Sequence, residues 1–177
     1  MGGLLIVVDY QRDFVDGSLG FPGAEALDGP IAARIAQRRR EGWDVAFTLD
    51  THGPGYLCTG EGRHLPVPHC IRDTEGWALY GETGASRLPG DPVFEKETFP
   101  SLALAQWLQG RAYGEVELCG LVSNICVLSN AVMVKAALPD AEIRVDARLT
   151  ASADPALHEK ALDVLEGIHV TVTGREG

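Results

Sequence analysis

The stretch Leu4–Asp9, LLIVVD, decides how this chain folds. Its consecutive apolar residues are typical of a strand that is buried on both faces of a parallel sheet. The stretch is much shorter than the roughly 20 apolar residues of a membrane-spanning helix. It ends on a carboxylate, and open parallel sheets bind ligands beyond the carboxyl ends of their strands. Asp9 is therefore a candidate for a functional site.

Similar apolar runs recur along the chain, and longer amphipathic segments separate them. This alternation predicts an α/β fold with a mostly parallel, six-stranded sheet covered by helices. We expect strands at Leu4–Asp9, Asp44–Leu49, Pro92–Glu95, Glu115–Cys119, Glu142–Val145 and Ile168–Val172. We expect helices at Leu27–Glu41, at Ser101–Gln109, from Ser123 to a point before Pro139, and from Asp154 through Glu166.

The length and composition limit the number of domains. A chain of 177 residues that is 45% hydrophobic can bury one core, but it is too short for two ordinary domains. We therefore expect a single domain over residues 1–177. The region Thr51–Gly90 is rich in glycine, proline and histidine and has no strand or helix pattern. Its length predicts a functional loop that binds metal or substrate.

Charge and cysteine content restrict the partners and the compartment. The net charge of −10 repels phosphate backbones, and the only basic run, Arg38–Arg40, fits the end of a surface helix, so we expect no nucleic-acid partner. No signal peptide or membrane span is apparent, which predicts a cytoplasmic protein with no membrane partner. Cys58, Cys70, Cys119 and Cys126 lack close paired spacing, so they are expected to be reduced, and one of them can be a working thiol.

Cys126 is the candidate nucleophile because it follows a predicted strand and a turn, at the start of a predicted helix. The partial positive charge of a helix N-terminus lowers the pKa of a thiol. We expect an exposed thiolate here to attack a carbonyl carbon, with the backbone amides of Val122 and Cys126 binding the oxyanion. The alternative is that Cys126 packs as a small buried side chain, as most free cysteines do.

Asp9 and Lys96 are candidate helpers of this nucleophile because each follows a different predicted strand. Asp9 can take the thiol proton and later pass it to a leaving amine. Lys96 can keep Asp9 ionised and stabilise negative charge. Taken singly, Asp9 also fits a turn cap and Lys96 a surface lysine. Together with Cys126 they predict a nucleophile, a base and a cation at one edge of the sheet.

The long region after the second strand contains a candidate metal site. Asp50 and His52 lie two positions apart, so their side chains can point the same way, and Glu61, His64 and His69 follow. Carboxylates and imidazoles suit zinc, iron or manganese. Because the spacing is loose, solvated loop residues are the alternative.

Aromatic residues provide candidates for binding a flat substrate ring. Phe14, Trp77, Tyr80 and Phe99 could stack on such a ring, although each also fits simple core packing. Phe14 is the favoured candidate because it lies only five positions beyond Asp9.

These motifs resemble those of the isochorismatase-like cysteine hydrolase superfamily, and most closely those of its nicotinamidases. The matching segments are Leu5–Phe14 for the first strand and its Asp-x-Gln-x-Asp-Phe motif, Asp50–His52 and Pro68–Gly76 for the metal loop, Lys96–Phe99 for the lysine segment, and Gly120–Val127 for the nucleophile turn. They occur in the family's order and span nearly the whole chain. Ser123, Asn124, Pro100 and Val67 depart from the family's usual residues. The motifs therefore do not identify which residues form the walls of the ring pocket.

The resemblance implies a three-layer, Rossmann-like sheet with helices on both faces and a catalytic triad of Asp9, Lys96 and Cys126. It implies a divalent metal ion, with zinc favoured over iron and manganese, held by Asp50, His52, Glu61 and His69. It also implies a cis peptide between Leu121 and Val122, and a homo-oligomer, dimer or tetramer. We expect Phe14, Gln11 and Trp77 to bind the substrate.

The leading interpretation is an amidohydrolase that converts nicotinamide, or a related aromatic amide, to the acid and ammonia through a thioester on Cys126. The metal would orient the ring by binding its nitrogen. An N-carbamoyl amide hydrolase would use the same triad without metal. An isochorismatase-type hydrolase is disfavoured because such enzymes typically lack the cysteine at the position of Cys126 and do not need the metal loop. A noncatalytic small-molecule-binding relative would not be expected to keep all three triad residues.

Overall fold

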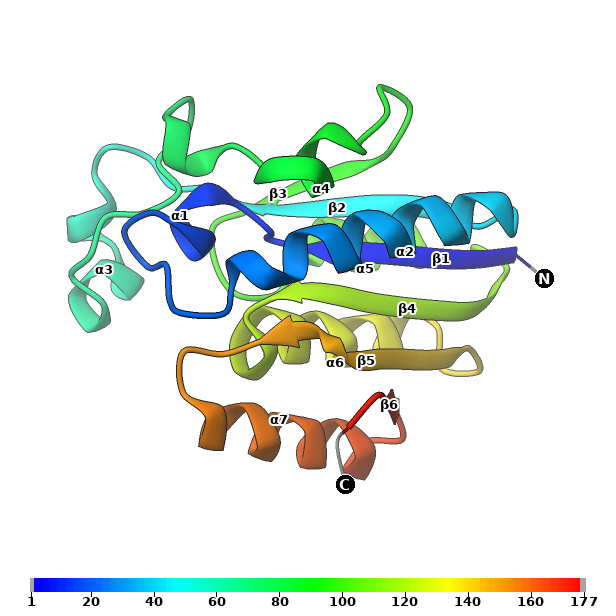
Figure 1. The fold of residues 1–177 in the computed structure, drawn as a ribbon. Helices are drawn as coiled ribbons and strands as arrows, with labels where there is room; N and C mark the ends of the chain where they lie inside the picture. Colours follow the sequence, from blue (N-terminus) through cyan, green and yellow to red (C-terminus); the bar gives the residue numbers. More distant parts are fainter. Residues whose placement is uncertain (1, 176–177) are drawn as a thin grey trace.

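Six parallel strands form the centre of the computed structural model, which describes residues 2–175 (Figure 1). The strands are β1 (Gly2–Val8), β2 (Asp44–Asp50), β3 (Val93–Lys96), β4 (Tyr113–Leu121), β5 (Glu142–Ala151) and β6 (Thr171–Thr173). Their order in the sheet is β3-β2-β1-β4-β5-β6. The predicted α/β fold is confirmed. The strands β4 and β5 are longer than expected because Leu121 still pairs with Ala151.

Four longer helices connect these strands, near the positions expected from the sequence. They are α2 (Asp28–Arg40), α5 (Leu102–Leu108), α6 (Leu128–Ala137) and α7 (Pro155–Gly167). The side chain of Ser101 accepts a hydrogen bond from the backbone of Leu104, and Asp154 accepts two from the first turn of α7. Both residues therefore cap helices by satisfying backbone N–H groups that would otherwise lack partners.

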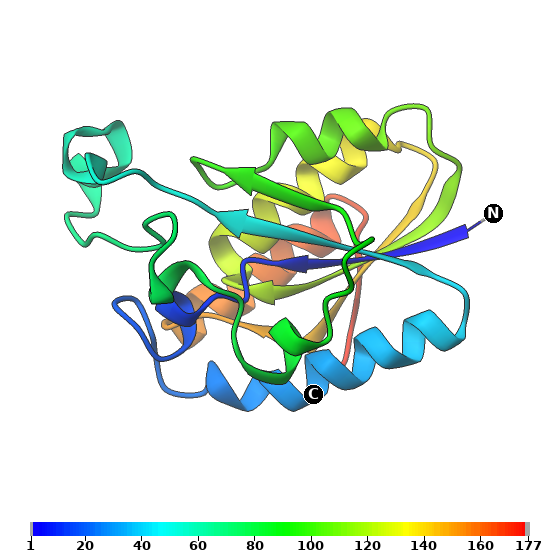
Figure 2. The same ribbon diagram turned by 90° about the horizontal axis from the view of Figure 1, so that it is seen from above.

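Helices cover both faces of the sheet, and β1 shows how (Figure 2). Leu4, Ile6 and Val8 pack in one apolar cluster with α5, α6 and α7, whereas Leu5 and Val7 pack in a second cluster with α2. All five side chains are fully buried. Because side chains alternate along a strand, an uninterrupted apolar run is what a central strand between two helical layers requires.

An ionic network joins α2 to the sheet beneath it. Arg34 donates to Asp146 on β5 at 2.9 Å and also pairs with Glu117 on β4, and Arg38 donates to Glu117 at 2.7 Å. Both carboxylates are buried, so they need these partners. Arg38–Arg40 do form the last turn of α2, as predicted, but Arg38 also supports the sheet.

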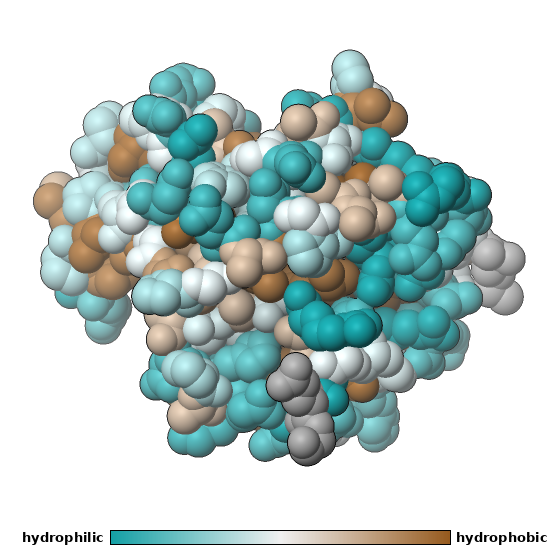
Figure 3. Space-filling model, in the orientation of Figure 1, coloured by the Kyte–Doolittle hydropathy of each residue, from teal (hydrophilic) through white to brown (hydrophobic). Residues whose placement is uncertain are grey.

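The expected long loop contains short helical turns. These are the 3-10 turns η2 (Tyr56–Cys58) and η3 (Glu75–Trp77) and the helices α3 (Gly60–His64) and α4 (Gly81–Ala85). Figure 1 places α3 beyond the carboxyl end of β2, and Figure 3 shows apolar patches at this end of the molecule. Two further short turns, η1 (Glu25–Leu27) and α1 (Arg12–Val15), precede α2. None of the helices within residues 2–175 is long and apolar enough to cross a membrane.

Candidate active site

Asp9, Lys96 and Cys126 meet beyond the carboxyl ends of β1, β3 and β4. The Lys96 Nζ atom lies 2.6 Å from Asp9 Oδ2 and 3.6 Å from Cys126 Sγ. Asp9 is fully buried, and Lys96 and Cys126 are each 5% exposed. The structure therefore brings together the three residues that we expected, from the strand order, to act as nucleophile, base and cation.

Thr48 holds Asp9 in this arrangement, and the sequence analysis missed it. Its hydroxyl donates to Asp9 Oδ1 at 2.6 Å, and the Asp9 N–H donates to the Thr48 carbonyl at 3.2 Å. Thr48 pairs with Val8 in the β1–β2 register, so it lies beside the residue where the chain leaves β1. A polar residue two positions before Asp50, within an otherwise apolar run, was the signal that could have identified it.

Close approach of β1 and β4 also shapes the site. Gly120 has a φ of +107°, and a Cβ atom there would lie 2.0 Å from the Val8 carbonyl oxygen. Only glycine fits this position, which directs the chain from β4 into the nucleophile turn η4 (Ser123–Val127). The Leu121–Val122 peptide is cis, as expected, and η4 is a single π-helical turn before α6.

Burial dominates the electrostatics of the triad. It raises the pKa of Asp9, and the charge of Lys96 only partly opposes this. Burial also disfavours the Lys96 ammonium, but the nearby Asp9, Cys126 and Asp50 outweigh it and raise its pKa. Lys96 therefore stays charged at neutral pH, while Asp9 and Cys126 together retain a proton.

The expectation of an exposed, acidic thiol at Cys126 is wrong. Burial raises the pKa of Cys126 well above its ordinary value, the charge of Asp9 adds to this, and Lys96 only partly counteracts it. The sulfur faces a carboxylate in a desolvated site, which outweighs the partial charge of one helical turn. The Cys126 thiol is therefore protonated at neutral pH.

Alkylation of Cys126 by iodoacetamide is accordingly expected to be slow at pH 7. Because the thiolate reacts and the pKa is raised, the rate should still increase with pH above about 9, where a free thiol levels off. The rate is measured by mass spectrometry of the Cys126 peptide in a Cys58→Ser background, since Cys58 is exposed. Alkylation at pH 7 that is faster than that of a free cysteine peptide would contradict this description.

Asp50, His52, Glu61 and His69 form a compact group of metal-ligand type beside the triad. One ligand atom from each lies within 4.8 Å of all the others. Asp50 Oδ2 is 3.1 Å from His52 Nε2 and 3.2 Å from His69 Nε2, and Glu61 Oε1 is 3.6 Å from each imidazole nitrogen. Asp50 also accepts a hydrogen bond from Lys96 at 3.2 Å, which links this group to the triad.

These residues fit a divalent metal ion. Two imidazole nitrogens and two carboxylates are a common zinc donor set, and iron and manganese also accept it. The other ring nitrogen of His69 hydrogen-bonds the Val67 carbonyl at 2.8 Å, which orients Nε2 toward the group. Within the described residues, Glu61 Oε2 is buried without a hydrogen-bond partner, as an oxygen reserved for a cation would be. His64 is exposed and lies outside the group.

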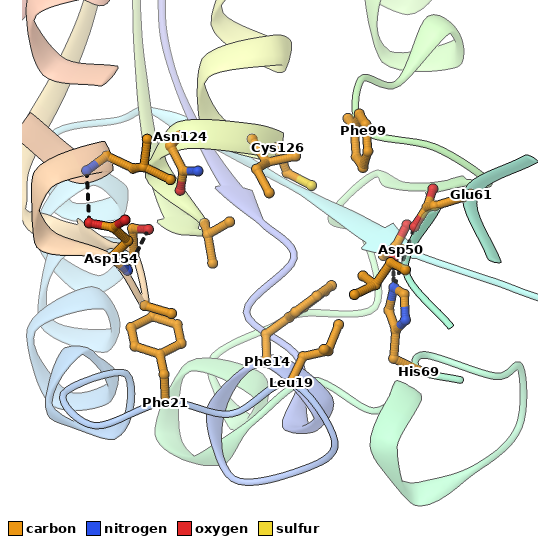
Figure 4. A pocket seen from close by; sticks show the side chains of 16 residues that line it. Phe14, Leu19, Phe21, Asp50, Glu61, His69, Phe99, Asn124, Cys126 and Asp154 are labelled. Carbon is orange, nitrogen blue, oxygen red and sulfur yellow. Dashed lines mark hydrogen bonds and ion pairs between the residues drawn. The ribbon is translucent and has the colours of Figure 1, made fainter. Parts of the chain in front are cut away.

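One cavity of about 260 Å³ borders both Cys126 and the metal group (Figure 4). Its polar side is formed by Asp50, Glu61 and His69, and Phe14 lies across the cavity from Cys126. The other walls are mostly apolar and include Leu19, Phe21, Phe99, Ile125 and Leu157. A small, apolar site with a few converging polar groups suits a flat ring that carries one reactive group.

The structure places Gln11 and Trp77 outside this cavity, which corrects their expected role in substrate binding. The Gln11 amide is fully used: Nε2 donates to the carbonyls of Asp50 and Trp77 at 2.9 and 2.8 Å, and Oε1 accepts from the Asp50 N–H at 2.8 Å. Trp77 donates to the Thr51 hydroxyl at 2.8 Å and lines a separate cavity. Both residues anchor the metal loop instead. The motif matched the family, but it did not show where the side chains point.

Asn130 is a second supporting residue that the sequence analysis missed. Its amide nitrogen donates to the Cys126 carbonyl at 2.8 Å and to the Phe99 carbonyl at 3.2 Å, and its oxygen accepts from the Ser101 N–H at 3.0 Å. This buried amide ties the nucleophile turn to the segment that follows Lys96. A polar residue four positions after Cys126, within a mostly apolar helix, was the available signal.

Comparison with known proteins identifies a family that matches nearly the whole chain and relatives that match 72% of it. The Isochorismatase domain family matches residues 3–176. An uncharacterized isochorismatase family protein from Bacillus subtilis is 34% identical over 140 residues, which cover 72% of this chain and 75% of that protein. A nicotinamidase/pyrazinamidase from Mycobacterium tuberculosis is 28% identical over 143 residues, which cover 72% of this chain and 75% of that protein.

Solved structures share the fold described above. A nicotinamidase/pyrazinamidase from Bacillus subtilis superposes with a TM-score of 0.85 at 30% identity, covering 98% of this chain and 100% of that one. A pyrazinamidase of Pyrococcus horikoshii, solved in complex with zinc, superposes with a TM-score of 0.81 at 23% identity, covering 99% of this chain and 100% of that one. The latter likeness concerns the fold alone.

Proposed function

Because this chain belongs to the isochorismatase family of hydrolases, we propose that it cleaves nicotinamide or a closely related aromatic amide to the carboxylic acid and ammonia. A single observation carries the proposal. Lys96 Nζ lies between Asp9 Oδ2, at 2.6 Å, and Cys126 Sγ, at 3.6 Å, and Cys126 borders one small cavity with the metal-ligand group.

In the first half of the proposed reaction, Asp9 takes the proton of Cys126 as the sulfur attacks the amide carbon. The backbone amides of Val122 and Cys126 bind the oxyanion, and the fixed charge of Lys96 balances the negative charge that the site gains. Asp9 then gives its proton to the nitrogen and the C–N bond breaks. Ammonia departs, and the acyl group remains bound to Cys126 as a thioester.

The second half releases the acid. Asp9 takes a proton from water, the resulting hydroxide attacks the thioester carbon, and the C–S bond breaks. The proton then returns to sulfur, which restores the starting state. The raised pKa values of Asp9 and Cys126 suit this exchange, because burial disfavours the charged form of both groups.

Asp50, His52, Glu61 and His69 would hold the divalent metal ion. Once bound there, the metal would supply a Lewis-acid position for a ring nitrogen of the substrate. The chain's own contribution to orientation is the opposing wall at Phe14, which faces Cys126 across the cavity. Holding a reactant in one pose can lower the barrier by several kcal/mol. Zinc is the proposed metal; a cytoplasmic location and a homo-oligomeric state stay predictions.

The test is ammonia release across a panel of nicotinamide, pyrazinamide, benzamide and an N-carbamoyl amino acid, with protein loaded with zinc, iron or manganese in turn. We expect nicotinamide or pyrazinamide to be cleaved best. Benzamide has no ring nitrogen and should be cleaved at least about tenfold more slowly if orientation through that nitrogen matters. Cleavage of the carbamoyl compound alone, without metal, would favour the N-carbamoyl amide hydrolase. No turnover of any amide would favour a noncatalytic binding role.

A further inference from the structure

Helix α7 packs against the nucleophile turn, and His158 connects the two. The Nδ1 atom of His158 lies 2.9 Å from the Ser123 hydroxyl oxygen. Ser123 is fully buried, and it directly follows Val122 in the chain. His158 is half-buried and does not line the cavity that borders Cys126. Any effect of His158 on the site would therefore pass through Ser123.

The imidazole suits this contact in its neutral form. Burial lowers the pKa of His158, so the ring is mostly uncharged at neutral pH. A neutral imidazole has one donor and one acceptor nitrogen, and a serine hydroxyl can donate or accept. The pair can therefore form its hydrogen bond with either nitrogen protonated. Without it, the fully buried Ser123 hydroxyl would lose its only side-chain partner among the described residues.

The nucleophile turn is already closed by its own backbone. The N–H groups of Ile125 and Val127 both donate to the Val122 carbonyl, at 3.2 and 3.1 Å. These bonds close the turn, and neither of them involves the Ser123 side chain. The buried hydroxyl of Ser123 is where α7 contacts that segment through a hydrogen bond.

We propose that His158 is a positioning residue that holds Ser123, and through it the oxyanion-binding amides of Val122 and Cys126, in their productive orientation. The inference rests on the proposed function, because it assumes that these amides bind an oxyanion. An oxyanion exists only after attack on the carbonyl. Loss of His158 should therefore weaken binding of the tetrahedral state while leaving binding of the planar substrate and product unchanged.

The test compares two ligands in zinc-loaded protein. Pyridine-3-carboxaldehyde forms a bond between Cys126 Sγ and the aldehyde carbon: the C=O π bond breaks, the charge goes to oxygen, and the thiol proton goes to Asp9. Nicotinate is the planar reference and forms no oxyanion. His158→Ala is expected to lower both the affinity for the aldehyde and kcat by at least about tenfold. This loss is smaller than the ~100-fold or more expected when a whole oxyanion donor is removed. The Kd of nicotinate and the KM of nicotinamide should change less than about twofold.

Three further variants make the test specific. His158→Asn places an amide near the position of Nδ1 and should restore most of the aldehyde affinity. Ser123→Ala removes the same hydrogen bond from the other side and carries the test if His158→Ala fails to fold. In a double-mutant cycle the losses of aldehyde affinity caused by the two alanine substitutions should not be additive, because both remove the same interaction. Lys160→Ala, at an exposed position of α7, is the matched control and should behave as the wild type.

Two outcomes would overturn the inference. One is an aldehyde affinity that His158→Ala and Ser123→Ala leave unchanged, and the other is an equal loss for aldehyde and nicotinate, which would indicate a general structural role. Failure of the proposed function looks different, because the wild-type protein itself would then form no covalent adduct with the aldehyde by mass spectrometry. That result would overturn both proposals.

Discussion

Replacing Cys126 by alanine is expected to lower kcat/KM for nicotinamide at least about 10⁴-fold, because no other group can form the thioester. The remaining oxyanion donors and the cavity cannot compensate, since they act on a bond that never forms. The free energy of unfolding should change by less than about 1.5 kcal/mol, because alanine removes only one buried sulfur atom. Ammonia release and urea denaturation measure the two effects.

The control for this variant is Cys58→Ala, at an exposed cysteine in the loop. It should retain wild-type turnover. The Cys126→Ala protein should still bind nicotinate with a Kd close to that of the wild type, which shows that the cavity is intact. Residual turnover within about tenfold of the wild type, with purity checked by mass spectrometry, would remove Cys126 from the role of nucleophile.

Replacing Asp9 by asparagine is expected to affect activity and stability together. Asparagine keeps the shape but cannot accept the thiol proton, so kcat should fall about 10³-fold, within the range measured for general bases. Lys96 would lose its carboxylate partner at 2.6 Å and keep Asp50 at 3.2 Å as its one charged partner among the described residues. Leaving a buried charge without its main partner should lower the free energy of unfolding by about 3 kcal/mol.

A second substitution separates these two effects. In the double variant Asp9→Asn/Lys96→Met the unpaired buried charge is gone, so much of the lost stability should return while kcat stays low. Urea denaturation and ammonia release on both variants give the comparison. A double variant that is as unstable as Asp9→Asn would mean that Lys96 is not the source of the cost. Recovery of activity would mean that Asp9 is not the base.

The sequence predicted the arrangement of the triad better than its chemistry. Parallel strands end at one edge, so Asp9, Lys96 and Cys126 were expected to converge, and they do. The pKa of Cys126 could not be read in the same way, because it depends on burial and on the distance to Asp9, which are properties of the folded chain. The helix N-terminus is visible in the sequence, but the desolvation that outweighs it is not.

The predicted substrate-binding role of Gln11 and Trp77 was wrong for a different reason. Gln11 and Trp77 belong to segments that resemble the family, but a motif fixes which residues occur and not where their polar atoms bond. Thr48 and Asn130 were not predicted, because no motif contains them and each is a single polar residue within an apolar strand or helix. Each such residue must find a buried partner, and asking for that partner would have pointed toward the site.

The Gln11 amide completes the end of β2 as if it were a short piece of neighbouring strand. It bonds both the N–H and the carbonyl of Asp50, so this candidate metal ligand is held by the segment that follows β1. Glu61 and His69, by contrast, lie in the chain between η2 and α4, so rebuilding that segment would alter the cavity wall and half of the candidate donor set together. Substrate range and metal retention are therefore expected to change together when this segment changes.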